Sequence, residues 1–383
     1  MANNNKHTGP NVPALRFPEF SGEWERYRLD ECVTFLDEKR KPIKSSDRVS
    51  EKGLYPYYGA SGIIDRIDNF IFDDDLVLLS EDGANILDRN YRVAFIVRGK
   101  AWINNHAHVL KPNCHTDIVF LSESLERIDY APYNTGTTMP KLNQEVCRGI
   151  MLYMPTPTEQ AKIGSLLKLV NERIEAQSKI IEELTALRSA LIEKCAKQSG
   201  NFYSLTDILQ EMEERSTAPN QYQVLSSTVK GIFSQKEYFN KDIASEDNKG
   251  YKVVRRGHIV LSPQNLWMGN INYNDRFDIG IVSPSYKVFS IKEGFNPIFI
   301  AALLQTKKAL NEYMLASEQG ASIVRRNLNI EAFMAIKFRI PDARQQDSLS
   351  MAITAINAKL NNERCYLEQL TMQKSCLLEN MFI

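Results

Sequence analysis

The chain has 383 residues, of which 43% are hydrophobic and 25% charged, a composition that suits two or three globular domains with their own cores. Its 47 basic and 47 acidic residues leave no net charge, which argues against a nonspecific coat for nucleic acid. No apolar run reaches the length of a membrane span, no secretory signal pattern opens the chain, and six cysteines form no CxxC pair. We therefore expect a cytoplasmic protein with reduced thiols and no membrane partner.

The first part of the chain, residues 1–156, predicts a mixed α+β domain. Four consecutive apolar residues at 76–79 stand between acidic segments, which is typical of a buried strand. Further strand-like stretches lie at 91–97 and 109–121. A polar loop containing glycine, residues 134–143, comes shortly before the end of this domain.

Residues 157–198 predict one long helix, because Thr158, Glu159 and Gln160 directly after two prolines make a good helix start. Apolar side chains recur at alternating steps of three and four residues, which places them on one face of a helix. About 40 residues at 1.5 Å each give a rod of roughly 60 Å, and a lone rod of this kind needs a partner for its apolar face. The predicted seam consists of Leu167, Val170, Ile174, Ile181, Leu184 and Leu191.

The second part of the chain repeats this plan, with a domain at residues 199–342 and a long helix at 343–383. The segment from Pro341 matches the segment from Pro155 at a constant shift of 186 residues. Pro, Gln, Asn, Thr and Ser recur at this shift together with the apolar positions, so we infer an internal duplication. The second seam consists of Ile353, Ile356, Leu360, Leu367, Leu370 and Leu377.

A catalytic centre is not evident in the sequence. Neither a phosphate-binding GxxxxGK[ST] loop nor a G-x-G-x-x-G turn is present. The acidic residues around 76–79 are expected to cap a strand. One cluster resembles a metal site, with two histidines expected on one strand face, but the second half has Ser285 and Lys287 at their positions. The cluster consists of His106, His108, Cys114 and His115.

Two polar loops at matching places in the halves are candidates for contact with DNA. Hydroxyl, amide and guanidinium groups are what base edges and phosphates require. The first loop offers Thr135, Thr137, Thr138, Lys141 and Asn143. The second offers Gln319, Ser322, Arg325, Arg326 and Asn327. Additional polar or stacking candidates are Tyr57, Tyr58, Ser61, Gln264, Asn265 and Trp267.

Together these features resemble the specificity (S) subunit of a type I restriction–modification system. The resemblance covers essentially the whole chain and depends on its layout more than on any single motif. The second entry segment, NFYSLTDILQEME, departs from the first by lacking its Arg-Phe-Pro and Trp. The matching segments are PALRFPEFSGEWE, YPYYGASG, LLSEDGAN, GTTMPKLN and Pro-Thr-x-x-Glu-Gln-x-Lys-Ile.

The resemblance implies an α+β fold with two target-recognition domains, separated by two long antiparallel coiled-coil helices, and a pseudo-twofold duplication. Each domain would read one half of a bipartite, asymmetric site on double-stranded DNA, and the helices would set the gap. The helices would also dock two modification subunits that methylate adenine, and restriction subunits would join them. S-adenosylmethionine, ATP and magnesium would belong to those partners, so this chain itself would be non-catalytic.

Two other interpretations remain open from the residues. The first is a coiled-coil scaffold with two protein-binding heads and no role on DNA. The second is an enzyme, either a nuclease or a metal hydrolase, that uses His106 and His108. A DNA-binding test separates the first alternative, and metal analysis with a His106→Ala variant addresses the second.

Overall fold

The computed structural model describes residues 11–48, 53–198, 200–239, 248–319 and 326–383. The chain divides into two compact units. Unit 1 comprises residues 1–177 together with 366–383, and unit 2 comprises residues 178–365. Each unit therefore contains one α+β globule and a segment of each long helix.

Unit 1 is built on two four-stranded sheets and one strand pair. The central strand β6 (Leu76–Ser80) is buried along its whole length, as its apolar sequence predicts. The antiparallel sheet around it has the order β2 (Val33–Phe35), β9 (Ala107–Pro112), β6 and β7 (Ala94–Val97). The second sheet has the order β4 (Gly62–Ile67), β3 (Tyr55–Gly59), β8 (Lys100–Ile103) and β5 (Phe72–Asp73). The strand pair consists of β1 (Glu25–Arg28) and β10 (Met151–Met154).

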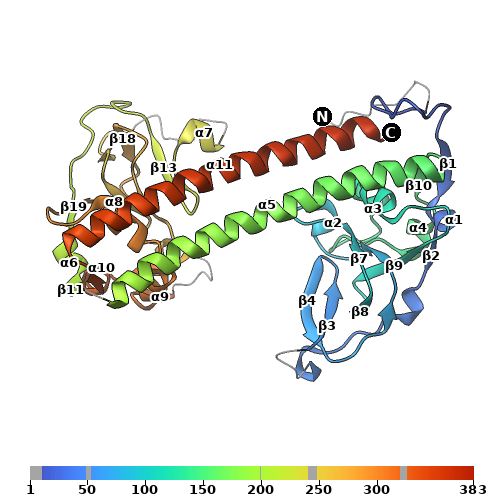
Figure 1. Cartoon of the computed structure of the whole chain (residues 1–383), viewed down its shortest axis with the longest axis horizontal. Coiled ribbons are helices and arrows are strands. Elements are labelled where there is room, and N and C mark those ends of the chain that lie inside the picture. Colours follow the sequence, from blue (N-terminus) through green and yellow to red (C-terminus); the bar gives the residue numbers. More distant parts are fainter. Residues whose placement is uncertain (1–10, 49–52, 199, 240–247, 320–325) are drawn as a thin grey trace. The chain divides into compact units, whose positions relative to one another are not determined.

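Helix α3 (Ile118–Arg127) covers strands β6 and β7 of unit 1 (Figure 1). It corrects our prediction of a strand through residue 121, because Asp117 accepts hydrogen bonds from the amides of Val119 and Phe120 and so starts a helix. The shorter helices of the unit are α1 (Leu29–Cys32), η1 (Asp37–Lys39), η2 (Ser45–Asp47), α2 (Asn85–Asp88), η3 (Ala131–Tyr133) and α4 (Gln144–Arg148).

Unit 2 repeats the central sheet of unit 1 strand for strand. Its order is β12 (Leu209–Glu211), β19 (Lys287–Ile291), β16 (Ile259–Leu261) and β17 (Ile271–Tyr273). Three antiparallel pairs and one pair next to the long helix complete the strands: β13 (Leu225–Thr228) with β14 (Gly231–Ser234), β15 (Lys252–Arg255) with β18 (Ile279–Val282), β20 (Ser317–Gln319) with β21 (Arg326–Leu328), and β11 (Asn201–Ser204) with β22 (Lys337–Ile340). Its shorter helices are α6 (Leu205–Ile208), α7 (Gln235–Phe239), η4 (Leu266–Met268), α8 (Pro297–Leu303), α9 (Lys307–Leu315) and α10 (Ile330–Ala335).

The strand register confirms the internal duplication. In unit 1, Leu79 of β6 faces His108 of β9, and in unit 2 Leu261 of β16 faces Lys287 of β19. His108 and Lys287 therefore hold the same place in their sheets, as the alignment of the two halves predicted.

The two long helices are α5 (Pro157–Gln198) and α11 (Ala343–Met381). Within each unit their segments lie side by side and run in opposite directions (Figure 1). In unit 1 the Arg173 guanidinium lies 5.5 Å from the Tyr366 ring, and in unit 2 Arg188 donates to Asn357 over 2.9 Å. In the described part of the chain, no helix combines the length and apolar character that crossing a bilayer requires.

All twelve predicted seam residues are buried or half-buried, which fits a two-helix interface. Leu167, Ile353, Leu360 and Leu370 are the fully buried ones. The second helix ends at Met381, two residues before our predicted end, because Phe382 turns into the core of unit 1.

A buried glutamine ties the start of α5 to unit 1. Gln160 Nε2 donates to the Pro155 carbonyl over 2.9 Å, and Gln160 Oε1 accepts from the Asp117 amide over 3.1 Å. Asp117 is the N-cap of α3, so one side chain holds the starts of two helices together.

The same device recurs at the start of α11 in unit 2. Gln346 Nε2 donates to the Pro341 carbonyl over 2.9 Å, and its oxygen accepts from the amide of Asn296 over 2.8 Å. Asn296 caps α8 as Asp117 caps α3. Both halves have a glutamine at this position, Gln160 and Gln346, because each forms the same pair of hydrogen bonds at the start of its long helix.

Replacing Gln346 with leucine is expected to lower the free energy of unfolding of unit 2 by about 1–3 kcal/mol, because two buried backbone groups lose their partners. Urea unfolding followed by circular dichroism measures this loss. Gln345→Leu, on the exposed side of the same turn, is the control and is expected to change the stability by less than about 0.5 kcal/mol. Equal losses in the two variants would contradict the assignment.

Candidate nucleic-acid interface

The first candidate surface lies where β6 ends in unit 1. We call it the first loop surface and define it as residues 81–83 and 134–143. The Leu142 amide donates to the Glu81 carbonyl over 2.7 Å, and the Gly83 amide donates to the Pro140 carbonyl over 3.0 Å. These bonds fasten the polar loop to the end of a buried strand, which gives an exposed loop a rigid support.

Asn134 organises the loop from within. Its side-chain oxygen accepts from the amides of Gly136 and Lys141 over 3.0 and 2.9 Å. A Cβ at Gly136 would lie 1.8 Å from the Met139 carbonyl oxygen, so this tight turn requires glycine.

The structure brings all five predicted residues of this loop to the surface, and each is exposed. Thr135 donates to the Lys141 carbonyl over 3.1 Å, and the Lys141 ammonium lies 3.4 Å from the Glu81 carboxylate. Asn143 caps α4 by accepting from the Glu145 amide over 3.3 Å. No hydrogen bond of the described residues engages the Thr137 or Thr138 hydroxyl, and both remain available to a ligand.

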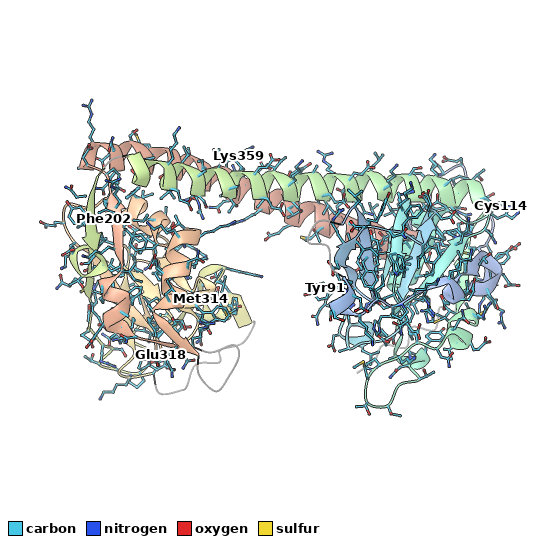
Figure 2. The ribbon with its side chains drawn as sticks, turned by 90° about the horizontal axis from the view of Figure 1, so that it is seen from below. Tyr91, Cys114, Phe202, Met314, Glu318 and Lys359 are labelled. Carbon is cyan, nitrogen blue, oxygen red and sulfur yellow. The ribbon has the colours of Figure 1, made fainter. Side chains whose placement is uncertain are left out.

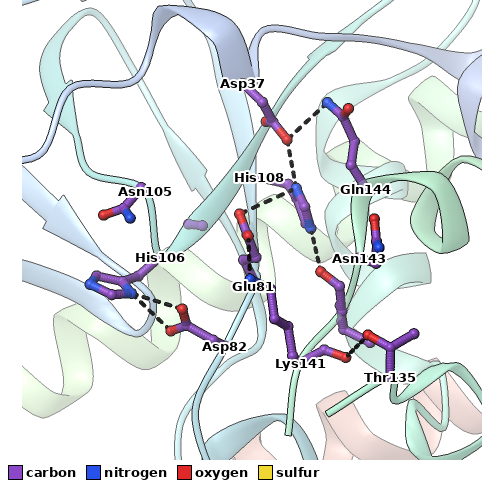
Figure 3. Close-up of polar contacts among 12 residues, drawn as sticks. Asp37, Glu81, Asp82, Asn105, His106, His108, Thr135, Lys141, Asn143 and Gln144 are labelled. Carbon is purple, nitrogen blue, oxygen red and sulfur yellow. Dashed lines mark hydrogen bonds and ion pairs between the residues drawn. The ribbon is translucent and has the colours of Figure 1, made fainter.

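A cluster of alternating charges supports the loop, and Figure 3 labels three of its members, Asp37, Glu81 and His108. We call it the charged cluster and define it as Asp37, Arg40, Glu81 and His108. The Arg40 guanidinium donates to Glu81 over 2.6 Å and lies 3.4 Å from the Asp37 carboxylate. His108 Nδ1 lies 2.7 Å from Asp37 Oδ2, and its Nε2 lies 2.9 Å from the Leu142 carbonyl oxygen.

His108 carries a proton on both ring nitrogens, because a carboxylate and a carbonyl can each only accept. Burial opposes the charged form, yet the hydrogen bond to Asp37 raises the pKa of His108 to about 10. Burial likewise opposes the charged Asp37, but His108 holds the pKa of that carboxyl below its usual value. The two cations and two carboxylates therefore balance.

This geometry suits ion pairing better than metal binding. Ligand atoms of Asp37, Glu81 and His108 lie within 4.8 Å of one another, a spacing that a metal ion accepts. However, the Arg40 cation already bridges the carboxylates, and neither nitrogen of His108 has a free lone pair.

The metal cluster considered from the sequence is not assembled. His106 precedes β9 instead of sharing a strand face with His108, and its Nδ1 lies 2.9 Å from Asp82. Cys114, labelled in Figure 2, and His115 lie exposed in the turn after β9. The two histidines thus each pair with a different carboxylate.

The second candidate surface lies at the equivalent place in unit 2. We call it the second loop surface and define it as residues 264–267 with Arg326 and Asn327. The Arg326 amide donates to the Gln264 carbonyl over 3.2 Å, and its guanidinium lies 5.1 Å from the Trp267 ring. Gln264 and Asn327 are exposed, whereas Asn265 and Trp267 are half-buried.

Strand β21 carries Arg326 and pairs with β20, where Glu318, labelled in Figure 2, faces Asn327. Gln319 belongs to β20 by its backbone, and Ser322 and Arg325 lie outside the described residues. The two loops correspond to each other at the 186-residue shift. In each unit the loop forms a backbone hydrogen bond with the segment that follows the central strand.

Tyr57 corrects one sequence prediction. Its side chain is 2% exposed, its hydroxyl accepts from the Ile43 amide over 3.0 Å, and the Arg48 guanidinium lies 5.1 Å from its ring. Because no face of this ring is open, Tyr57 is a core residue and not a stacking platform. Tyr58 is half-buried against Phe95, and Ser61 is exposed in the turn between β3 and β4.

The support of the first loop surface comes from residues that no motif in the sequence connects. Asp37 and Arg40 are far in the chain from Glu81 and Gln144, yet Gln144 donates to Asp37 over 3.0 Å and Arg40 donates to Glu81 over 2.6 Å. The one signal in the sequence was His108 itself, a polar residue in a strand whose adjacent residues, Ala107 and Val109, are apolar and buried.

Comparison with known proteins gives a consistent result. Residues 21–186 match the family model described as the type I restriction modification DNA specificity domain. A putative type I restriction enzyme specificity subunit of Haemophilus influenzae is 35% identical over 145 residues, which cover 38% of this chain and 36% of that relative. The match therefore spans about a third of the relative's length.

The fold also has a solved counterpart. The crystal structure of the S subunit of a type I restriction–modification system from M. genitalium aligns with a TM-score of 0.61 at 16% identity. The alignment covers 97% of this chain and 99% of the other. The predicted α+β architecture with two long helices is confirmed by this likeness.

Proposed function

Because residues 21–186 match the DNA specificity domain of type I restriction–modification systems, we propose that the chain is a specificity subunit and selects the DNA sequence on which such a complex acts. The observation that carries the proposal is the placement of two polar loop surfaces at equivalent positions in the two units. Each surface would read one half of a bipartite site on double-stranded DNA. The match to a DNA specificity domain does not favour the alternative of a scaffold without a role on DNA.

The chemistry of the two surfaces suits base reading. Threonine hydroxyls and the Lys141 ammonium of the first loop surface offer contacts to base edges and phosphates. On the second, Arg326 lies over Trp267, and within the described ranges it forms no ion pair. A guanidinium in this state retains donors for a guanine edge, the commonest specific contact in DNA recognition. Differences between the loops would give the two half-sites different sequences.

The remaining parts have proposed roles around this reading function. The seams of α5 and α11 would set the gap between the half-sites, and the same helices would dock two adenine-methylating modification subunits. Restriction subunits would join that core in the cytoplasm. S-adenosylmethionine, ATP and magnesium would bind to these partners. With no net charge on this chain, much of the phosphate binding would also come from them, and the isolated chain would bind DNA weakly.

Selection from a random pool of DNA duplexes, using the complex with its modification subunits, tests the proposal. The wild-type complex is expected to enrich a bipartite sequence. Arg326→Ala is expected to cost about 1–3 kcal/mol at one base position of one half-site, because a bidentate base contact is lost. A scaffold would enrich nothing.

Arg256→Ala is the matched control, because this arginine is exposed in unit 2 and paired with Asp278. It is expected to leave the selected sequence unchanged. If Arg326→Ala weakened binding to all duplexes equally, Arg326 would be a phosphate contact and not a base reader.

A further inference from the structure

We propose that His108 is a positioning residue that holds the first loop surface in the conformation that reads DNA. The inference rests on the proposed DNA-reading function. It assigns a role to a buried residue, whereas the candidates named so far were chosen for exposed loops. His108 is 1% exposed, so it cannot touch DNA itself. It acts through Leu142.

Leu142 is held on both sides of its backbone. Its amide donates to the Glu81 carbonyl over 2.7 Å, and its carbonyl accepts from His108 Nε2 over 2.9 Å. Its side chain is fully buried. Leu142 stands directly between Lys141 and Asn143, two exposed residues of the first loop surface, so its position decides where both of them point.

His108 in turn is fixed from the opposite side. Its Nδ1 lies 2.7 Å from Asp37, which also accepts from Gln144 over 3.0 Å and from the Val109 amide over 2.8 Å. Glu81 Oε2 lies 3.8 Å from His108 Nδ1 and accepts a hydrogen bond from Arg40. The His108 ring thus links Asp37 of η1 to Leu142 of the loop (Figure 3).

The equivalent residue of unit 2 shows that the fold itself does not require this link. Lys287 occupies the position of His108 and pairs with Glu211 over 2.6 Å. In unit 2 a single ammonium group at this strand position is enough to pair with the neighbouring carboxylate. A histidine adds a second donor on its far side, and in unit 1 that donor reaches the loop.

Two neutral variants separate positioning from simple stability. In His108→Asn the amide nitrogen falls near the place of Nδ1, so the link to Asp37 is kept and the link to Leu142 is lost. In His108→Gln the amide nitrogen falls near Nε2, so the link to Leu142 is kept. Both variants lose the same charge and the same ring, which makes them matched controls for each other.

The readout is the sequence selected from a random duplex pool by the complex with its modification subunits. His108→Asn is expected to lower discrimination about tenfold at the half-site that Arg326→Ala leaves unchanged, a loss comparable to one good base contact. His108→Gln is expected to stay within about threefold of wild type there. The other half-site is expected to be unaffected in both variants.

Hydrogen exchange of residues 134–143 gives a second measurement on the same proteins. Faster exchange in this loop is expected for His108→Asn, with the strands of unit 1 still protected. If His108→Asn failed to fold, His108→Lys would replace it, since the equivalent strand position in unit 2 accepts lysine. One ammonium cannot replace two ring nitrogens that face different segments, so the same loss of discrimination is expected.

The outcomes distinguish this inference from the function on which it rests. A wild-type complex that enriches no sequence would overturn the proposed function. A wild-type complex that enriches a bipartite sequence, with equal discrimination in the Asn and Gln variants, would overturn the positioning role alone.

Discussion

Replacing Phe120 with alanine is expected to lower the free energy of unfolding of unit 1 by about 3–5 kcal/mol, the usual cost of removing a buried aromatic side chain. Phe120 is fully buried on α3. Its ring stacks on Phe382 with centroids 5.0 Å apart, and Trp24 meets it edge-on at 5.6 Å. The cost includes both the lost burial and the cavity left by the ring.

Urea unfolding, combined with hydrogen exchange to assign the loss to unit 1, measures this effect. Leu169→Ala is the control on α5, since Leu169 is 64% exposed and its removal is expected to cost less than about 0.5 kcal/mol. A Phe120→Ala loss as small as that of the control would contradict the burial of Phe120 in this core.

Replacing Glu123 with glutamine is expected to destabilise unit 1 by about 3 kcal/mol at neutral pH, because breaking a buried ion pair leaves cations without a counter-charge. Glu123 is 2% exposed on α3. Its Oε1 lies 3.0 Å from Arg92 and 3.1 Å from Lys374, and it accepts from Asn171 over 3.3 Å. The carboxylate thus ties the globule to both long helices. Arg92 reaches solvent, which keeps the expected loss at the lower end of the range for buried pairs.

The effect of Glu123 depends on pH with a defined sign. Burial opposes its charged form, but Arg92 and Lys374 outweigh burial and hold the pKa of Glu123 below its ordinary value of 4.5. Its contribution is therefore complete above pH 4.5 and is lost as the pH falls through the lower, folded-state pKa. Unfolding at pH 7 and at progressively lower pH measures the difference between wild type and Glu123→Gln, which is expected to shrink in acid.

Glu172→Gln is the control for this series, because Glu172 is exposed on α5 and forms a surface pair with Lys168 at 3.8 Å. It is expected to change stability by less than about 1 kcal/mol at any pH. A difference between wild type and Glu123→Gln that stayed constant into acid would contradict the ion-pair explanation.

The long helices were predictable because their signal is local. A 3.6-residue period, prolines at the start and a repeat at fixed shift are all readable from the sequence, and α5 begins at Pro157 as the pattern indicates. The end of α11 was less predictable, because the turn at Phe382 depends on Trp24 and Phe120, which are distant in the chain.

The positions of the two loops in the chain could be predicted from the sequence, but the residues that hold the loops in place could not. The duplication predicted matching places for the two loops, and in each unit the described part of the loop bonds to the segment after the central strand. The burial of Tyr57 and the charged cluster around His108 arise from segments that pair only in three dimensions. Side-chain type alone cannot distinguish a tyrosine that stacks on a base from one that fills a core.

The most direct test of the two-headed reading function is methylome sequencing of a host that expresses this chain together with a type I modification subunit. A gapped, asymmetric motif with methyladenine in both halves is the expected result. Removing four residues from each long helix is then expected to shorten the gap or abolish methylation, since four residues are about one helical turn. A stable complex that methylates no gapped motif would contradict the account.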